Sequence, residues 1–220
     1  MHRRSDTIAR ILIVRNDYDT ITHYMHEWSK PVIEAAENNG IKVDCVDGKN
    51  VIRSEVTSRI GKVNPSFIFL NGHGDDKTFY GYQDQVLIEP EDAGIFKERI
   101  VFSRACNCAK GLGRHAVQMH GCTSFIGYEF EFVNVRRTST EVIPLKDEIS
   151  RPIWEASNAV PLSLIKGSAV DESIEASHKR AARDMLRLVF SGEIGSIEVL
   201  KALIANDEAL AYHGDGSAKI

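Results

Sequence analysis

Short apolar runs alternate with longer amphipathic segments along the first half of the chain. The apolar runs are rich in β-branched and aromatic residues and lack the period-2 alternation of a half-exposed strand, so they predict buried strands. These runs lie at residues 8–14, 41–46, 67–70, 99–105 and 123–128.

The segments between these runs predict helices and a small hairpin, and some of them carry apolar residues at helical spacing. The predicted helices span 20–40, 51–63, 90–96 and 109–121, and the predicted hairpin spans 77–89. Asn39-Gly40 is a helix-ending signal for the first helix. Pro31 lies inside that helix, so we expect a kink or two short helices there.

After Tyr128 the pattern changes. Residues 129–142 alternate only weakly, and we expect the stretch 128–145 to be a flap or a surface loop. Three helical patterns and a final short strand follow, at 149–166, 172–190, 196–206 and 208–216. Because no repeat, low-complexity segment or linker interrupts the chain, we expect residues 1–220 to form a single domain.

The order of these elements predicts the fold class. Strands that alternate with helices form parallel sheets, because a parallel pair needs a long crossover connection. We therefore predict an α/β fold with a mostly parallel sheet of about six strands flanked by helices.

Composition and charge narrow the class of function. Of the 220 residues, 43% are hydrophobic and 26% are charged, as in an ordinary globular protein. No apolar run approaches the ~20 residues of a membrane span, and the run near the start is too short for a signal peptide. We expect a cytoplasmic protein without a membrane partner. A net charge of −4 gives no reason to expect nucleic acid as a partner.

Two of the predicted strands end in residues that suit catalysis. Gly72-His73-Gly74 follows the third run, and Cys106 follows the fourth. Since reactive groups gather beyond the carboxyl ends of parallel strands, we expect His73 and Cys106 to lie close together. A helix beginning just after Cys106 would favour a thiolate, and His73 would act as acid and base. The N–H groups of Gly74 and Cys106 would bind the oxyanion of an acyl transfer, and the two glycines would let a substrate approach.

A strand that ends in Gly-His-Gly, followed by a strand that ends in Ala105-Cys106, resembles the caspase-like cysteine peptidases. These include caspases, metacaspases, gingipains, separases and CHAT domains. The resemblance implies a mostly parallel six-stranded sheet, a catalytic dyad of His73 and Cys106, and Gly74 as the glycine that follows the histidine. It implies an endopeptidase without a cofactor, similar to the compact bacterial and CHAT-type members, and a role in bacterial defence.

The chain departs from the caspase pattern in two places. The caspase signature Q-A-C-[RQG]-G follows its histidine by about 50 residues. Here the stretch is "RACNC", and Cys106 follows His73 by 33 residues. The chain therefore does not resemble metazoan caspases in particular.

Charged residues near the dyad point to opposite substrate preferences. In this family the residue two positions before the nucleophile lines the pocket for the P1 side chain, and here it is Arg104. An arginine there would bind an acidic P1 side chain. Asp75 and Asp76 follow His73 and would favour a basic one. The P1 preference therefore stays open, with a lean toward acidic.

Two alternatives remain beside the peptidase. One is a zinc site, because several thiols and imidazoles fall within 17 positions: Cys106, Cys108, His115, His120 and Cys122. Their spacing lacks the paired cysteine knuckle, and His115 and His120 do not share a helix face. The other is a catalytically idle interaction or regulatory module. For the peptidase, the expected partners are a protein or peptide substrate and an activating partner or ligand.

Overall fold

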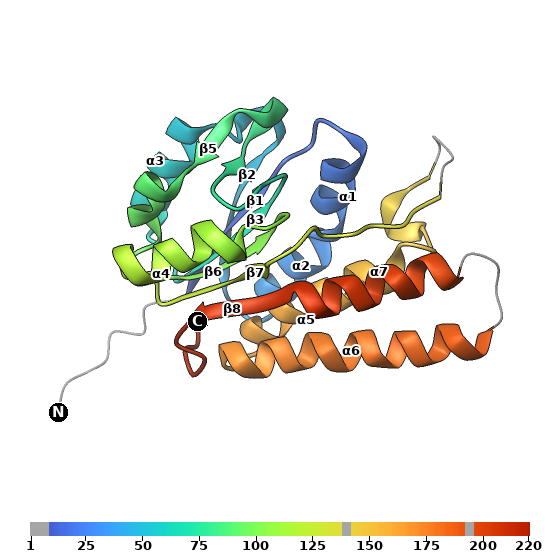
Figure 1. The fold of residues 1–220 in the computed structure, drawn as a ribbon. Coiled ribbons are helices and arrows are strands. Elements are labelled where there is room, and N and C mark those ends of the chain that lie inside the picture. The colour runs from blue at the N-terminus through green and yellow to red at the C-terminus, as the bar shows by residue number, and fades with distance from the viewer. Residues whose placement is uncertain (1–8, 138–141, 192–195) are drawn as a thin grey trace.

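The computed structural model describes residues 9–137, 142–191 and 196–220. The central sheet contains β1 (Arg10–Arg15), β2 (Lys42–Asp47), β3 (Phe67–Asn71), β6 (Ile100–Arg104), β7 (Ser124–Tyr128) and β8 (Leu210–Gly214). Its strand order is β2-β1-β3-β6-β7-β8 (Figure 1). Neighbouring strands are parallel, except that β8 runs antiparallel to β7. The predicted α/β fold with a mostly parallel six-stranded sheet is therefore confirmed.

Helices cover both faces of the sheet and form a three-layer arrangement. One face packs against α1 (Thr20–Trp28), α2 (Lys30–Asn38), α5 (Arg151–Ile165), α6 (Val170–Ser191) and α7 (Ser196–Ala209). The other packs against α3 (Arg53–Val63), the 3-10 helix Pro90–Phe96, α4 (Arg114–His120) and the hairpin of β4 (Phe79–Tyr80) and β5 (Val86–Ile88). Short 3-10 turns lie at Gly48–Asn50, Tyr82–Asp84 and Pro144–Lys146. In Figure 1 the long helices α6 and α7 run side by side.

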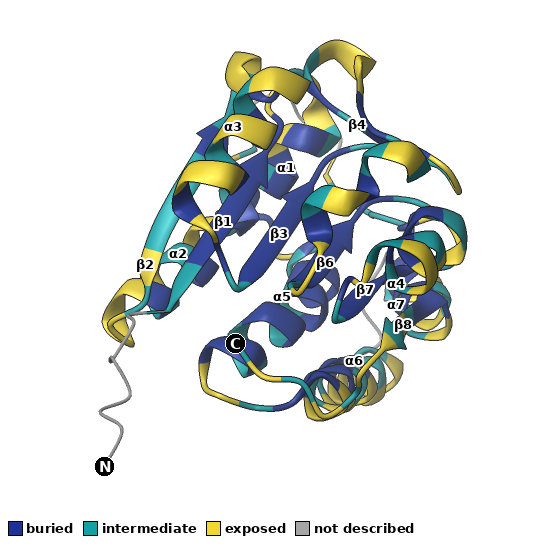
Figure 2. Ribbon diagram, turned by 90° about the vertical axis from the view of Figure 1, so that its left-hand side faces the viewer, coloured by how far each residue is buried: buried dark blue, intermediate teal, exposed yellow. Residues whose placement is uncertain are grey.

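The inner strands are buried on both faces, which explains their unbroken apolar pattern. In β3, Phe67 and Phe69 belong to the core on the α5 side, while Ile68 and Leu70 belong to the core on the α3 side. Every residue of β3, β6 and β7 is buried, as the dark blue strands of Figure 2 show.

Most predicted elements are present with shifted ends. The segment 20–40 divides into α1 and α2 at Ser29, next to the proline that predicted a break. The first strand begins at Arg10, and residue 8 of the predicted run lies outside the described residues. Residues 129–137 of the predicted flap form neither helix nor strand, and 138–141 lie outside the described residues. In the described ranges, every helix is too short or too polar to cross a lipid bilayer.

Candidate active site

The loops that follow β3 and β6 leave the same edge of the sheet. These strands are parallel neighbours, and Asn71 pairs with Arg104 where both strands end. The N–H of Gly72 continues this pairing with a 3.4 Å hydrogen bond to the carbonyl oxygen of Arg104. His73 and Cys106 each lie two residues beyond the last pair. The register therefore brings the loop that carries His73 next to the loop that carries Cys106.

A carboxylate holds the loop after His73 in a tight hairpin. Backbone hydrogen bonds close the hairpin between His73 and Tyr80. Inside it, the Asp75 carboxylate accepts hydrogen bonds from the N–H groups of Lys77 and Thr78 and the hydroxyl of Tyr80, at 2.6 to 2.8 Å. Burial opposes ionisation, yet these hydrogen bonds lower the pKa of Asp75. Both carboxylate oxygens are engaged inside the loop, which gives Asp75 a structural role, while substrate contact by Asp75 stays a prediction.

Asp76 plays a different part in the same hairpin. Its side chain is exposed, and its carbonyl oxygen accepts a 2.7 Å hydrogen bond from the N–H of Leu112. Leu112 belongs to the segment that follows Cys106. The hairpin after His73 and the segment after Cys106 are therefore linked through their backbones, while substrate contact by Asp76 stays a prediction.

The two glycines beside His73 are required by internal packing. A Cβ on Gly72 would lie 2.3 Å from Nδ2 of Asn16, and one on Gly74 would lie 2.5 Å from Sγ of Cys108. Such separations are far below van der Waals contact, so a larger residue would force the loops apart. The sequence suggested that these glycines make room for a substrate, but the structure fills the same space with the protein's own side chains.

Cys106 lies in the sharp turn that follows β6. The next residue, Asn107, has a φ of +58°, a conformation that is uncommon for residues other than glycine and recurs at functional sites. A π-helix at Ala109–Gly113 follows and continues into α4. The helical segment therefore begins at Ala109, where the predicted helix begins, three residues beyond Cys106.

The environment of Cys106 favours the neutral thiol. Burial raises the pKa of Cys106, and a 3.4 Å hydrogen bond from the N–H of Phe132 to Sγ only partly opposes this. Burial therefore works against the thiolate that the sequence suggested, and a base near this sulfur would help to remove its proton.

Asp19 fixes the orientation of His73. Its Oδ2 lies 2.6 Å from Nε2 of His73. Asp19 is also the N-cap of α1, where its Oδ1 accepts the N–H of Thr22 at 2.8 Å. Burial opposes ionisation, but the hydrogen bonds from Thr22 and His73 lower the pKa of Asp19. An ionised Asp19 keeps the imidazole proton on Nε2, which leaves Nδ1 as a proton acceptor.

Sequence reasoning did not single out Asp19. The stretch Asn16–Asp19 follows β1, and Asp19 precedes Thr22 by three residues, which is the spacing of a helix N-cap. The pattern therefore indicated a helix start and gave no sign of chemistry. Only the pairing of β1 with β3 brings the end of β1 next to His73.

The proposed oxyanion donors are the backbone N–H groups of Gly74 and Cys106. Within the described ranges, neither Gly74 nor Cys106 donates a hydrogen bond to a backbone carbonyl. Gly74 pairs with Phe79, but the residues on either side of them make the hydrogen bonds of this pair. Binding of an oxyanion by these two groups stays a prediction.

Arg104 is completely buried on the α5 side of the sheet. Its Nε donates to Oγ of Ser157 at 2.9 Å, and its Nη2 donates to Oδ1 of Asn158. The guanidinium carbon lies 4.9 Å from the centre of the Phe69 ring and 5.3 Å from that of Trp154. Burial lowers the pKa of Arg104 to about 10.

The charge of Arg104 has no acidic partner among the described residues, and its Nη1 has no hydrogen bond. A buried cation without a counter-charge is unfavourable, so the site suits an anion. The side chain has no contact with solvent in this structure. A substrate carboxylate would reach it only after the residues that cover it move.

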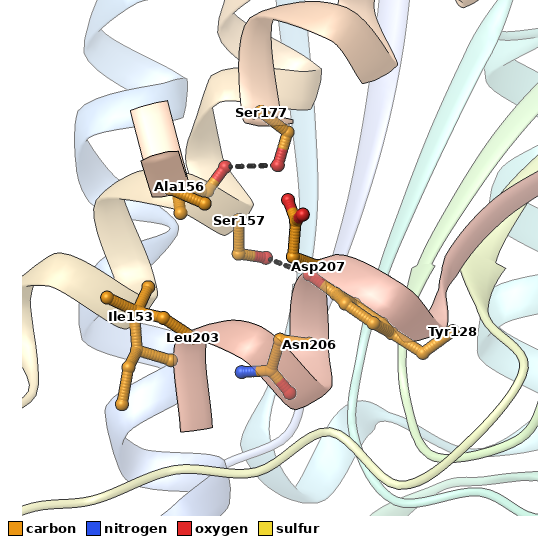
Figure 3. A pocket seen from close by; sticks show the side chains of 9 residues that line it. Tyr128, Ile153, Ala156, Ser157, Ser177, Leu203, Asn206 and Asp207 are labelled. Atoms are coloured by element: carbon orange, nitrogen blue, oxygen red, sulfur yellow. Dashed lines mark hydrogen bonds between the residues drawn. The ribbon is translucent and has the colours of Figure 1, made fainter. Parts of the chain in front are cut away.

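A small cavity of about 10 Å³ lies beside Ser157 (Figure 3). The hydroxyl of Tyr128 donates to Oγ of Ser157 at 2.9 Å, and the hydroxyl of Ser177 donates to the carbonyl of Ala156 at 2.8 Å. This volume suits one water molecule at most. It is too small for a substrate side chain, so we do not assign it to substrate binding.

The residues of the alternative zinc site do not converge. Cys108 and Cys122 donate to backbone carbonyl oxygens at 3.6 and 3.4 Å. The rings of His115 and His120 contact each other at 5.2 Å, closer than their spacing on a helix suggested. Among the described side chains, no three ligand groups come together in a way that would hold a metal ion. Burial raises the pKa of Cys108 and of Cys122 to about 12, which is typical of unreactive core thiols.

No protein-family model and no curated protein sequence matches the chain. Solved structures do match. In the complex of the pro- and mature domains of RgpB from Porphyromonas gingivalis, the TM-score is 0.61 at 10% identity, over 96% of this chain and 48% of that one. For the Arg-specific cysteine proteinase gingipain R (RgpB), the TM-score is 0.57 at 10% identity, over 97% of this chain and 49% of that one.

These matches establish the fold. The chain has the caspase-like α/β arrangement and spans about half the length of the gingipain chains that it matches. The sequence resemblance to a family that includes gingipains is therefore confirmed at the level of architecture. The closer likeness to CHAT domains and the role in bacterial defence stay predictions.

Proposed function

We propose that this protein is a cysteine peptidase in which Cys106 is the nucleophile, His73 is the acid and base, and Asp19 orients His73. The observation that carries the proposal is the hydrogen bond from His73 to Asp19 in a loop that the β3–β6 register brings next to Cys106. The fold, shared with a cysteine proteinase, supports the same class of reaction.

In the first half of the reaction, Nδ1 of His73 takes the proton from the Cys106 thiol. The sulfur then attacks the carbonyl carbon of the scissile peptide bond and forms a tetrahedral intermediate. The C–N bond breaks, His73 returns the proton to the leaving amine, and a thioester remains. In the second half, His73 removes a proton from water, the hydroxide attacks the thioester, and the carboxylic product leaves as the thiol is restored.

The N–H groups of Gly74 and Cys106 would stabilise the negative oxygen of both tetrahedral intermediates. One of these residues follows the base and the other is the nucleophile itself, so both donors belong to the loops that carry the reacting groups. A backbone donor in such a position typically contributes about 10²- to 10³-fold to the rate.

For the P1 side chain, the lean toward an acidic residue rests on Arg104. This residue ends β6 and precedes Cys106 by two positions, so the Cα atoms of the two residues lie within about 7 Å of each other. Among the residues that the structure describes, its guanidinium has no acidic partner and its Nη1 has no hydrogen bond. The hydrogen bonds of the Asp75 carboxylate within its own loop favour Arg104 over Asp75 for this role. The arginine specificity of gingipain R belongs to that protein.

A peptide library with acidic and basic P1 residues tests both parts of the proposal. Wild type, Cys106→Ala and His73→Ala are incubated with the library, with and without calcium, and products are identified by mass spectrometry. We expect cleavage after acidic residues by wild type, and a loss of about 10³-fold or more in either variant. Cleavage that survives Cys106→Ala would exclude this mechanism.

The role of Arg104 is tested with Arg104→Met, which keeps an unbranched stem about as long as the arginine stem and removes the guanidinium and its charge. We expect the variant to lose cleavage after acidic residues by about tenfold or more, with less effect on neutral ones. An equal loss on every peptide would assign Arg104 a purely structural role.

A further inference from the structure

The segment that follows β7 passes over the nucleophile. The N–H of Phe132 donates to Sγ of Cys106 at 3.4 Å. Two residues earlier, the carbonyl oxygen of Phe130 accepts the N–H of Asn107 at 3.0 Å. The backbone of this segment therefore pairs with Cys106 and with the residue after it, in the way that an extended peptide pairs with a binding site.

The side chain of Phe132 occupies an aromatic site on the α5 side of the sheet. It is 8% exposed, although it belongs to an irregular segment. Its ring centre lies 4.8 Å from that of Tyr128 and 5.3 Å from that of Trp154. The guanidinium of Arg104 lies over the same Trp154 ring. Phe132 and the arginine that we propose for P1 recognition therefore contact the same aromatic side chain.

A side chain from α7 holds the segment in place. Oδ1 of Asn206 accepts the N–H of Val133 at 2.7 Å, and its Nδ2 donates to the carbonyl oxygen of Val133 at 2.8 Å. One amide thus satisfies both backbone groups of a single residue.

The side chain of the neighbouring Asn134 is short of hydrogen bonds in the same arrangement. Its side-chain oxygen and nitrogen are both buried without a hydrogen-bond partner. Buried polar atoms without partners are unfavourable, so moving the segment away would relieve this penalty. The segment is therefore held by contacts that a competing ligand can replace.

We propose that residues 130–134 form an internal plug. Phe132 occupies the P1 pocket, the backbone covers Cys106, and wild type cleaves slowly because this segment leaves the site only part of the time. The proposal rests on the peptidase function above and names its regulation. Release exposes the thiol and opens a path to Arg104, which explains how a completely buried arginine can serve a substrate.

Phe132→Ala tests the plug, and Phe130→Ala is the matched control. Both remove a phenyl ring from the same segment, but Phe130 is 60% exposed and Phe132 is 8% exposed. The rate of Cys106 alkylation by iodoacetamide is followed by peptide mapping, and cleavage of the P1 library is measured in parallel. We expect roughly tenfold faster alkylation of Cys106 in Phe132→Ala than in wild type, and no change in Phe130→Ala.

Asn206→Ala provides a second variant that leaves the aromatic site intact. Alkylation of the buried Cys108 reports general unfolding, so selective labelling of Cys106 over Cys108 is part of the expected result. Equal Cys106 rates in wild type, Phe132→Ala and Asn206→Ala would overturn the plug, whatever the cleavage assay shows. Faster labelling without cleavage of any library peptide would support the plug and count against the peptidase function.

Discussion

The loop after β3 and the loop after β6 are stabilised in different ways, although they leave neighbouring strands at the same edge of the sheet. The His73 loop is held by Asp75 inside the loop and by Asp19 at the start of α1. The Cys106 turn contains a residue with positive φ and is covered by residues 130–134, which lie in a separate part of the chain.

In the proposed mechanism, this difference separates the group that would act as the base from the segment that would control the thiol. The base is oriented by groups close to it, so its geometry does not depend on the covering segment. The proposed nucleophile, Cys106, is half-buried, burial raises its pKa, and its Sγ accepts a hydrogen bond from the N–H of Phe132. A segment that moves can therefore switch the thiol without disturbing the imidazole.

Asp19→Asn should produce the largest change on the His73 side. An amide cannot hold the imidazole proton as a carboxylate does, so we expect kcat to fall by about 10²- to 10⁴-fold. Activity is measured in the wild-type and Phe132→Ala backgrounds. Full activity in Asp19→Asn would remove Asp19 from the mechanism.

Thr22→Ala is the control for the second role of Asp19. The Thr22 hydroxyl accepts the N–H of Asp19 at 3.0 Å in the cap of α1, but has no contact with His73. We expect this variant to lose about 1 kcal/mol of stability, with kcat within about twofold of wild type.

On the Cys106 side, we expect the four thiols to differ in reactivity. Cys106 should be alkylated first, about 10²-fold faster than Cys108 and Cys122, whose pKa values are near 12. Because burial also raises the pKa of Cys106, its alkylation rate should still rise with pH above about 8.5, which is the ordinary pKa of a cysteine thiol. A rate that is already constant at neutral pH would indicate a resting thiolate and contradict this account.

The hydrogen bonds that Asp75 accepts inside the His73 loop are tested by comparing Asp75→Ala with Asp76→Ala. Loss of the carboxylate leaves the N–H groups of Lys77 and Thr78 without their acceptor, so we expect about 1–3 kcal/mol of destabilisation and roughly a tenfold lower kcat. Asp76 is exposed, and its substitution should change stability by less than about 0.5 kcal/mol. Urea unfolding and kcat distinguish the two. Equal effects of both substitutions would show that the Asp75 carboxylate has no special role in stabilising this loop.

The smallest effect concerns stability in acid. The pKa of Asp19 and that of Asp75 are lower in the folded protein than in an unfolded chain. Their contribution to stability is therefore present above the ordinary carboxyl value of about 3.9 and is lost as pH falls through the lower folded values. Urea unfolding between pH 6 and pH 3 should show this decline, with a shallower slope in Asp19→Asn. An identical slope would mean that other carboxylates dominate.

Sequence patterns predicted the sheet well, because burial on both faces leaves a direct mark on a strand. The unbroken apolar run of β3 and the break near Pro31 both appear in the structure as expected. Charged side chains were harder to interpret. Asp75 and Arg104 were both expected to face a substrate, yet one is engaged within its own hairpin and the other is buried beside α5.

The sequence by itself determined the strands and the order of strands and helices along the chain, because these depend on local periodicity. It also determined which residue types follow two of the strands. Tertiary structure alone decided that β1 lies next to β3, which gives His73 its carboxylate. It also decided that Phe132 covers Cys106, more than twenty residues along the chain. Contacts between distant segments arise from packing of the whole sheet, and no short window of sequence records them.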